Sequence, residues 1–305
     1  MNVFLKPDEI VEIVRANYSL DKIKHCMFII RGMNDSYFIA TSKEKYVFRV
    51  YLNNKYFIKS DSAYRFELDL LAYLHQNNVP VANALANING KLLGTVQTTL
   101  GDRSFALFPY AEGIPLASRS ITSNQCYNIG KYLAKIHQTS NSFITTHKRY
   151  RLDLKYLIEQ PLKLISEGAE TKGTNPKFDE LIAEGERIVG MLQPLDNYIE
   201  RINNISLNSD QFGIIHADLH PGNMHFYGDE VTIFDFDHCG FGWRAYDLAI
   251  AYHYPTTEQR DSIISGYESL RPLSDEERDS LQDFANLRNL WNIGDIIATE
   301  TLRDL

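Results

Sequence analysis

The stretch HADLHPGN, residues 216–223, places an acid, an amide and two histidines directly after the short apolar run 212–215. A second apolar run, 231–236, follows after the turn Tyr227-Gly228-Asp229. β-branched and aromatic residues dominate both runs, and Gly-Asp is typical of a tight turn. We therefore expect two adjacent strands that form a hairpin.

Such a hairpin would bring Asp218, Asn223 and Asp235 to the same end of its two strands. One carboxylate there can orient a hydroxyl nucleophile, while an amide oxygen and a second carboxylate are good ligands for Mg²⁺. Phosphoryl transfer depends on in-line positioning and on neutralised phosphate charge, which this set of side chains can supply. The pattern therefore indicates phosphoryl-transfer chemistry.

Three sequence blocks in order make the interpretation specific. They are HADLHPGN, then IFDFD at 233–237, which puts Asp235 twelve residues after Asn223, and then YDLA at 246–249. Together they resemble the aminoglycoside phosphotransferase and choline kinase family, which has the protein-kinase-like fold. This resemblance implies that Asp218 is catalytic, that Asn223 and Asp235 hold the metal, and that His216 and Asp247 are structural braces of the loop.

One position departs from the family pattern. Ala217 stands where the family usually has Gly or Arg. Alanine is small, so we expect little loss, although its backbone does not reach positive φ freely.

The N-terminal part supplies candidates for nucleotide binding. Gly32 and Asn34 lie between two expected strands, where the resembling family has its phosphate-covering loop, and an ordinary hairpin turn is the alternative. Arg49 lies on the next strand, where kinases carry a phosphate-binding lysine. Glu67 interrupts the apolar face of the expected helix 61–76, and a buried carboxylate needs a partner. The resemblance implies that Glu67 is the helix glutamate that pairs with Arg49, and a surface glutamate is the alternative.

The segment after the last N-terminal strand resembles the hinge between the lobes of a kinase. The resemblance implies that the Tyr110 carbonyl and the Ala111 amide bind the edge of the nucleotide base. A plain loop is the alternative.

Other residues near the two motifs are weaker candidates. His220 and Asp237 are candidates for acceptor contact or for a supporting role, whereas His238, Cys239, Trp243 and Trp291 are expected in the core or in pocket walls. Arg288 and Asn292 lie one turn apart on the expected last helix, and we interpret them as a solvated helix face. Contact with the substrate is the alternative.

The order of expected elements predicts an α+β protein with two lobes. The family resemblance implies that these lobes form a protein-kinase-like fold. The β-rich front holds a helix at 8–18 and strands at 26–31, 37–41, 46–51 and near 96 and 105–108. The back holds helices at 123–138, 151–168, 177–203, 257–270 and 275–300. We place the nucleotide-binding lobe at 1–110 and the catalytic and acceptor-binding lobe at 111–305.

Composition narrows the function classes. The 305 residues carry a net charge of −8, which argues against nucleic-acid binding. Residues 1–112 carry 13 Lys and Arg against 11 Asp and Glu, a net +2, and the remainder carries 18 against 28, a net −10. Solvated helix faces are the preferred explanation of the acidic remainder, and a cationic acceptor is the alternative. Three distant cysteines, no apolar run long enough to span a bilayer and no secretory signal pattern predict a cytoplasmic protein without membrane contact.

The function predicted from the sequence is a kinase for a small molecule, with ATP as donor, GTP as the alternative donor, and Mg²⁺. An amino-alcohol or an aminoglycoside-like compound is the expected acceptor, and the oligomeric state is left open. A protein Ser/Thr kinase of the same fold is an alternative, but only eleven residues separate Asp235 from Asp247, which is short for an activation segment. A nucleotide-binding pseudokinase and a metallohydrolase built on the His216, Asp218, His220 and His225 cluster are further alternatives.

Overall fold

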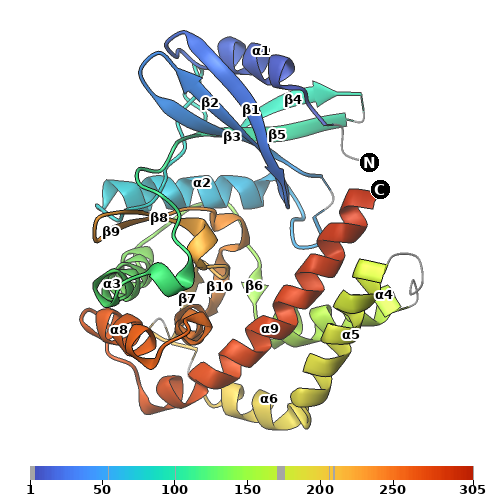
Figure 1. Ribbon diagram of the computed structural model, residues 1–305, viewed down its shortest axis with the longest axis vertical. Coiled ribbons are helices and arrows are strands. Elements are labelled where there is room, and N and C mark those ends of the chain that lie inside the picture. The colour runs from blue at the N-terminus through green and yellow to red at the C-terminus, as the bar shows by residue number, and fades with distance from the viewer. Residues whose placement is uncertain are drawn as a thin grey trace.

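The computed structural model describes residues 4–53, 55–99, 101–169, 176–205, 207–208 and 210–304. Its N-terminal part is built around one β-sheet and its C-terminal part is mostly helical, as Figure 1 shows. This arrangement confirms the expected α+β class. Among the described residues, no helix combines the length and the hydropathy needed to cross a bilayer.

The N-terminal sheet has five antiparallel strands in the order β1-β2-β3-β5-β4. Helix α1 packs on it through Ile10 and Val14, which are fully buried together with Tyr37 and Phe48 of the strands. The turn at 42–44 joins β2 to β3 as expected. The elements are α1 (Pro7–Asn17), β1 (Ile23–Arg31), β2 (Asn34–Thr41), β3 (Lys45–Tyr51), β4 (Gly94–Thr98) and β5 (Gly101–Pro109).

Helix α2 (Asp61–Gln76) lies between the sheet and the helical part in Figure 1. Its bounds match the predicted helix, because the apolar residues recur at helical spacing along its whole length. Leu68, Leu70, Leu71 and Leu74 are buried, and so is Glu67. The helix therefore carries a carboxylate into the interior.

The C-terminal part consists of helices α3 (Ser123–Ser140), α4 (Gln160–Ala169), α5 (Pro176–Met191), α6 (Leu195–Asn203), α7 (Arg244–Leu248), α8 (Thr257–Glu268) and α9 (Asp275–Asp304). Short helical turns connect them: η1 (Ser118–Ser120), η2 (Lys155–Glu159), η3 (Pro221–Asn223), η4 (Phe236–His238) and η5 (Ala249–His253). Two expectations were wrong. The helix expected at 177–203 is interrupted at Pro194, which has no N–H to donate and restricts the residue before it. The helix expected at 151–168 begins instead with strand β6 (Arg151–Leu152), which pairs with a strand almost ninety residues later.

The expected hairpin is only partly correct. Strand β7 (Phe212–Ile215) pairs with β10 (Gly240–Trp243), and β6 completes that sheet. The hairpin is formed by β8 (Met224–Tyr227) and β9 (Glu230–Ile233), joined by the turn at 228–229. The two predicted strands, β7 and β9, thus belong to different sheets, because the loop 216–223 reverses the chain between them.

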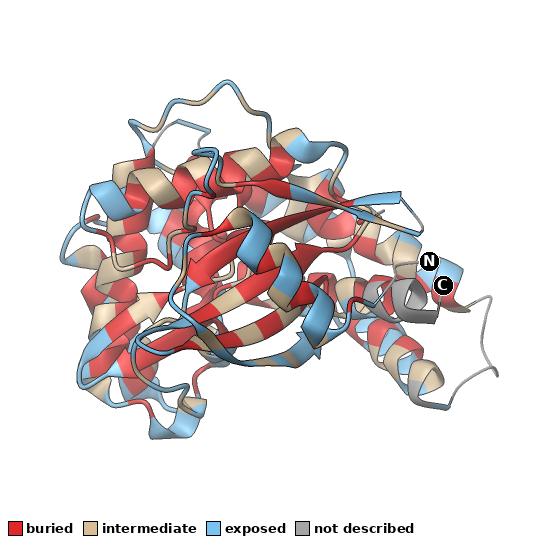
Figure 2. Cartoon of the chain, turned by 90° about the horizontal axis from the view of Figure 1, so that it is seen from above, coloured by how far each residue is buried: buried red, intermediate tan, exposed pale blue. Residues whose placement is uncertain are grey.

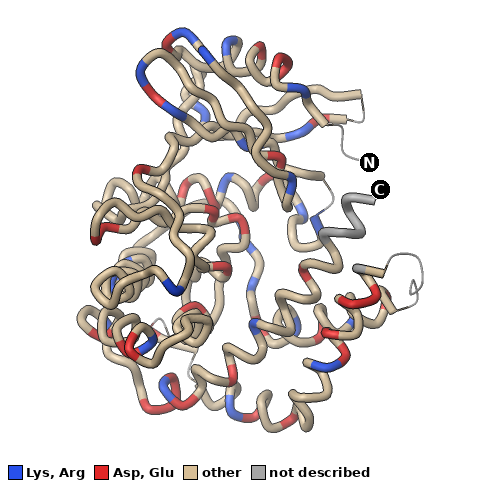
Figure 3. The backbone as a smooth tube through the Cα atoms, in the orientation of Figure 1, with Lys and Arg blue, Asp and Glu red and all other residues tan. Residues whose placement is uncertain are grey.

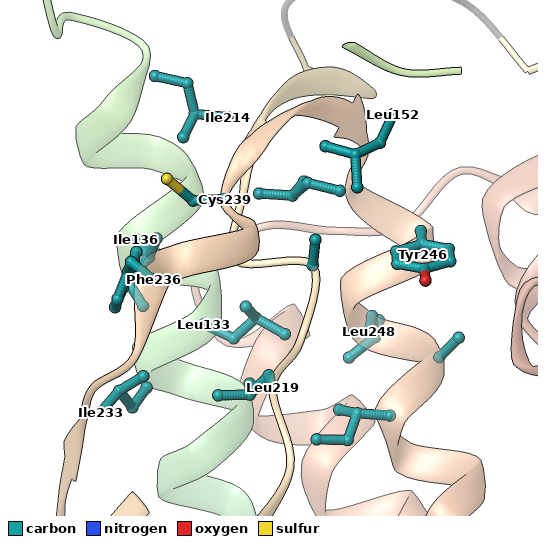
Figure 4. Packing of buried hydrophobic residues seen from close by; sticks show 14 of the residues in the cluster. Leu133, Ile136, Leu152, Ile214, Leu219, Ile233, Phe236, Cys239, Tyr246 and Leu248 are labelled. Atoms are coloured by element: carbon teal, nitrogen blue, oxygen red, sulfur yellow. The ribbon is translucent and has the colours of Figure 1, made fainter. Parts of the chain in front are cut away.

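The core of the C-terminal part lies directly behind the loop 216–223. Leu219 and Phe236 follow Asp218 and Asp235 in the chain, and both side chains are fully buried. Figure 4 shows them close to Leu133 and Ile136 of α3. Figure 2 shows that burial extends through the sheet and along the inner faces of the helices. Each of the two acidic residues is therefore held at the edge of the core by its apolar neighbour.

Candidate functional site

A cleft of about 790 Å³ lies between the β-sheet and the helical part. It brings together most of the residues selected from the sequence: Gly32, Asn34, Arg49, Tyr110, Ala111, Asp218, His220, Asn223, Asp235 and Asp237. Glu67, His216 and Asp247 are fully buried beside it. Residues more than 200 positions apart in the chain thus share one cavity.

The loop 216–219 is fixed from behind by Asp247 of α7. The Asp247 carboxylate accepts the main-chain N–H of His216 at 2.6 Å and of Ala217 at 2.7 Å. The His216 ring accepts the Asp218 N–H through Nδ1 at 3.2 Å and lies 3.0 Å from the Phe234 carbonyl through Nε2. Both ring nitrogens are therefore engaged within the protein. This is the geometry expected of a loop brace.

Burial shifts the pKa values of the ionisable groups around Asp247. Burial lowers the pKa of His137 to about 4, and the ring lies 3.1 Å from Asp247 and 2.7 Å from the Tyr267 hydroxyl. Burial also lowers the pKa of His216. The pKa of Asp247 is lowered despite its burial, since His137 and His216 stabilise the carboxylate. The loop is thus held by one buried carboxylate that accepts two main-chain N–H groups and also lies against the His137 ring.

Ala217 adopts a backbone conformation that the sequence did not lead us to expect. Its φ is +70°, in the left-handed region. This region costs alanine on the order of 1–2 kcal/mol. Asp247 binds the Ala217 N–H, and Arg288 of α9 donates to its carbonyl at 2.9 Å, so both sides of the residue are held.

Asp218, Asn223 and Asp235 converge at the mouth of the cleft. The Asn223 side-chain NH₂ donates to the Asp218 carbonyl at 2.9 Å and lies 3.3 Å from the Asp218 carboxylate. Its amide oxygen is thereby directed away from Asp218. The Phe234 N–H donates to the Asn223 carbonyl at 3.0 Å, which places Asp235 next to Asn223. Asp235 has φ +63°, which turns the chain sharply after β9.

Arg288 of α9 contacts the loop that carries Asp218, which the sequence did not lead us to expect. Its side chain is 2 % exposed and lies 3.3 Å from the Asp218 carboxylate. It also donates to the carbonyls of Ala217 and Leu219. The solvated helix face expected there was wrong. A signal existed, because position 288 falls on the apolar stripe of α9 between Leu281, Phe284 and Trp291.

Arg49 and Glu67 form the predicted buried pair, with an N–O distance of 2.8 Å. The second guanidinium nitrogen lies 3.1 Å from Asp235. Burial by itself would lower the pKa of Arg49, but the two carboxylates outweigh it and raise this pKa. Burial raises the pKa of Glu67. Arg49 thus connects α2 to the carboxylate at the end of β9.

A second buried ion pair, Lys55 with Asp237, was not predicted. The Lys55 ammonium lies 2.7 Å from the Asp237 carboxylate and 2.7 Å from the Asn34 amide oxygen. The Asn34 NH₂ also donates to Asp237 at 3.2 Å. Asp237 and Asn34 are therefore tied to each other, which couples the loop at 32–34 to the segment after β9. The partners are 182 positions apart, so no local pattern could have revealed the pair.

Tyr110 and Ala111, which the sequence suggests as the hinge, also line the cleft. The Tyr110 N–H donates to the Lys45 carbonyl at 3.0 Å, and the Ala111 carbonyl lies 2.8 Å from Nδ1 of His225. Gly32 lies across the cleft, and a Cβ atom there would meet nothing within 4 Å. His220 is half exposed, with Nε2 3.6 Å from the Asp218 carboxylate.

The geometry disagrees with a metallohydrolase. His216 uses both ring nitrogens inside the protein, and His225 is directed at the hinge. In the described ranges, no group of three or more His, Cys, Asp or Glu side chains is arranged to hold a metal ion. The four-residue cluster suggested by the sequence is therefore not a ligand set.

Comparison with known proteins matches the phosphotransferase enzyme family to residues 31–284. The chain belongs to this family. A homoserine kinase of Sinorhizobium medicae is 27 % identical over 286 residues, covering 90 % of this chain and 78 % of that protein. An amicoumacin kinase solved in complex with AMP-PNP, Ca²⁺ and Ami has a TM-score of 0.73 at 21 % identity, covering 95 % of this chain and 85 % of that one. A microcompartment-associated aminopropanol kinase has a TM-score of 0.72 at 20 % identity, covering 96 % and 93 %.

Membership confirms the predicted protein-kinase-like fold and the predicted activity as a small-molecule phosphotransferase. The matched region begins at Arg31 and ends within α9, so it contains the cleft residues from Gly32 to Asp237. Asp295 and Ile296 of α9 line the cleft beyond the matched region.

Proposed function

We propose that this phosphotransferase moves the γ-phosphate of ATP to a hydroxyl group of a small molecule that carries an amine. The observation that supports this most strongly is the convergence of Asp218, Asn223 and Asp235 in one cleft with Arg49. Kinases work mainly by positioning and by charge stabilisation, and these four side chains supply both.

Asp218 is the proposed catalytic residue. Its carboxylate would accept a hydrogen bond from the acceptor hydroxyl and take the proton as the phosphoryl group is transferred. Asn223 and Arg288 contact Asp218 and limit its rotation. His216 and Asp247 act as braces, because they hold the main-chain N–H groups of His216, Ala217 and Asp218.

Asn223 and Asp235 are the proposed ligands of Mg²⁺. The Asn223 amide oxygen is left for a cation because the NH₂ faces Asp218, and Asp235 offers a carboxylate, so both are the oxygen donors that Mg²⁺ prefers. When bound, the ion would neutralise phosphate charge during transfer. An amicoumacin kinase of this fold was solved with AMP-PNP and Ca²⁺, which supports an ATP and divalent-cation requirement.

The nucleotide would occupy the side of the cleft formed by the sheet. Arg49 would contact the phosphates, with Glu67 holding its guanidinium in place. Gly32 and Asn34 belong to the loop that would cover the phosphates, and Tyr110 with Ala111 would bind the base. We accordingly divide the chain into a nucleotide-binding lobe at 1–110 and a catalytic lobe at 111–305.

The acceptor would occupy the side near α9. Asp295 lines the cleft there and accepts a hydrogen bond of 3.0 Å from the Tyr56 hydroxyl. Burial raises the pKa of Asp295, and Asp218 and Asp237 raise it further. An ammonium group placed beside it would favour the carboxylate form. Nδ1 of His238, also at this end, is buried with no hydrogen-bond partner among the described residues. This environment suits an amino-alcohol, and relatives named homoserine kinase and aminopropanol kinase are consistent with it.

The residues that line the cleft near α9 support an amine on the acceptor more strongly than the net charge of the chain does. Figure 3 shows acidic residues scattered over the helical part rather than gathered in one patch. The net charge of the region therefore reflects mostly solvated surface. The proposal that the acceptor carries an amine rests on Asp295 in the cleft.

A small acceptor fits better than a protein substrate. The segment from Asp235 to Asp247 forms η4, β10 and the start of α7, and β10 is paired on both edges with β6 and β7. The segment is thus part of the core and does not form an exposed loop that could dock a peptide.

A reducing compartment such as the cytoplasm is the proposed location. Cys26, Cys126 and Cys239 are all free thiols. This fits a protein that needs no disulfide.

The test is ATP consumption by the purified protein with Mg²⁺ against a panel of amino-alcohols, aminoglycosides, sugars and peptides. We expect turnover with an amine-bearing alcohol, and Asp218→Asn should lower that turnover by about 100- to 10,000-fold. Asp229→Asn, in the exposed turn of the β8–β9 hairpin, is the matched control. Full activity of Asp218→Asn would contradict the assignment. Binding of Mg·AMP-PNP with no turnover over the whole panel would instead favour a pseudokinase.

A further inference from the structure

Lys55 follows β3 and precedes α2, and its ammonium group is buried between the sheet and the helical part. Its Nζ lies 2.7 Å from the Asn34 amide oxygen, and 2.7 and 3.0 Å from the two carboxylate oxygens of Asp237. An ammonium group has three N–H donors, so these three acceptors account for all of them. The side chain is fully buried, whereas Asn34 and Asp237 line the cleft. Lys55 therefore acts from behind the cleft and has no donor left for a substrate.

Packing keeps the Lys55 side chain in this position. Its ammonium nitrogen lies 5.1 Å from the ring centroid of Tyr51 and 5.3 Å from that of Tyr64, within the range of a cation–π contact. Phe57, two residues later, packs against His238 with ring centroids 4.6 Å apart. The segment that carries Lys55 therefore rests directly on the chain that follows β9.

Both acidic residues of the block IFDFD are paired with cations of the N-terminal part. Arg49 lies 3.1 Å from Asp235, and Lys55 pairs with Asp237. Nucleotide and metal compete with the first pair, since Arg49 is the proposed phosphate contact and Asp235 the proposed metal ligand. The second pair uses neither of these groups and can persist in the loaded site. Lys55 is therefore the cation that can join the sheet to this segment while nucleotide is bound.

Arg149 holds the main chain of the same segment. Its guanidinium donates to the main-chain carbonyl of Asp237 and to that of Ala63 in α2. The main chain at Asp237 is thus fixed by Arg149, while the carboxylate is fixed by Lys55. Asp235, two residues earlier, takes its direction from a chain that is held at both points.

We propose that Lys55 is a positioning residue that locks the phosphate-covering loop onto the metal-binding segment. Through Asn34 it holds the loop 32–34 over the phosphates. Through Asp237 it holds Asp235 toward the metal. Mg²⁺ demands a near-ideal octahedral arrangement of oxygen ligands, so the loop and the carboxylate must keep a fixed spacing. One buried ammonium group sets that spacing.

The inference rests on the proposed roles of the loop 32–34 and of Asp235, and it can fail while those roles stand. The measurement is the affinity for Mg·AMP-PNP by titration calorimetry, which needs no acceptor. Asn34→Ala removes both contacts of the loop with the ion pair and should weaken binding by about tenfold. Lys55→Met combined with Asp237→Leu, the apolar pair, removes the other end of the lock and should weaken binding by at least as much.

The apolar pair separates positioning from stability. Breaking a buried ion pair on one side is strongly destabilising, but replacing both partners with apolar residues is often neutral. The melting temperature of the apolar pair should therefore stay close to that of the wild type and above that of Lys55→Met alone, although its affinity falls. Lys55→Met with Asp237→Asn serves if the apolar pair melts well below the wild type. Lys59→Met, at an exposed position four residues later, is the matched control and should keep the wild-type affinity.

Combining all three substitutions tests whether the residues act as one unit. Asn34→Ala added to the apolar pair should weaken binding by no more than about twofold beyond the pair, because the partners of Asn34 are already gone. The inference is overturned if the two effects multiply to about 100-fold, or if Asn34→Ala binds like the wild type. Wild-type affinity in the apolar pair would show that Lys55 serves only the fold, and would overturn it too. Wild-type protein that does not bind Mg·AMP-PNP would overturn the nucleotide site itself, and the inference with it.

Discussion

Replacing Arg288 with methionine tests how the catalytic loop is held. The guanidinium donates to the carbonyls of Ala217 and Leu219 and lies 3.3 Å from the Asp218 carboxylate. Methionine fills similar volume but donates nothing, so two buried carbonyls and one carboxylate lose their partner. Removing one member of a buried charged contact typically costs about 3–5 kcal/mol. We expect a loss of that size in the free energy of unfolding.

Turnover should fall as well, because Asp218 would lose one of the contacts that limit its rotation. Loss of precise positioning of a reacting group commonly costs about 100-fold in rate. Urea unfolding followed by tryptophan fluorescence measures the first effect. ATP consumption with the best acceptor of the panel measures the second, at saturating substrates.

Arg278→Met is the matched control on the same helix. Arg278 pairs with Glu268 at the surface, and its side chain is half exposed, so the same substitution should cost less than about 1 kcal/mol. Arg288→Lys keeps the charge, but its ammonium group lacks the forked guanidinium that reaches three acceptors. The stability and the turnover of this variant should lie between those of the wild type and Arg288→Met. The reasoning is refuted if Arg288→Met matches Arg278→Met in both stability and turnover.

Three further predictions concern other parts of the molecule. Glu67→Gln removes the charge that holds Arg49, and calorimetry should show Mg·AMP-PNP binding weakened by about three- to tenfold; unchanged affinity would separate the pair from the nucleotide site. Because His137 has a folded-state pKa of about 4 against a usual 6.5, the unfolded state binds more protons between these values, and stability should fall by about 3 kcal/mol as the pH drops from 6.5 to 4. A series of urea titrations should show this slope, and His137→Gln should flatten it. Gly130→Ala would place a Cβ atom 1.8 Å from a carbonyl oxygen of α8 and should destabilise the protein by about 2 kcal/mol or more. At Gly190 a Cβ atom would meet nothing within 4 Å, so Gly190→Ala should stabilise the protein by about 0.5–1 kcal/mol. Melting temperatures of the two variants that fail to move in opposite directions would contradict this prediction.

The pattern of the sequence was enough to predict most elements and the fold. Helix α2 matches its predicted bounds, because an amphipathic period of 3.6 residues is a local property. The strands β2 and β3 were also expected, since alternation and turn residues mark them. Pairing between distant segments was not predictable in this way. The partner of β7 lies after the hairpin β8–β9, and nothing within Phe212–Ile215 identifies it.

The same distinction between local patterns and distant contacts applies to the residues of the candidate site. Asp218, Asn223 and Asp235 were selected from the sequence because carboxylate and amide side chains at fixed spacing after short strands are chemically distinctive. Glu67 was predicted to pair because a carboxylate on an apolar helix face must have a partner. We expected Arg288 to be exposed because it is charged, although its position on the apolar stripe of α9 indicated burial.

The sequence by itself was enough to indicate phosphoryl-transfer chemistry at 216–223, because the three blocks and their order are defined by residue types and short spacings. Only the tertiary structure decided how that loop is held and what it faces. Arg288, Lys55 and His225 contact residues that are 70, 182 and 114 positions away. The physical reason is that such contacts arise from packing of complete elements against one another, and packing geometry is not encoded in any single stretch of the chain. The loop indicated phosphoryl transfer to a hydroxyl, and the fold showed the buried partners that give the loop its shape.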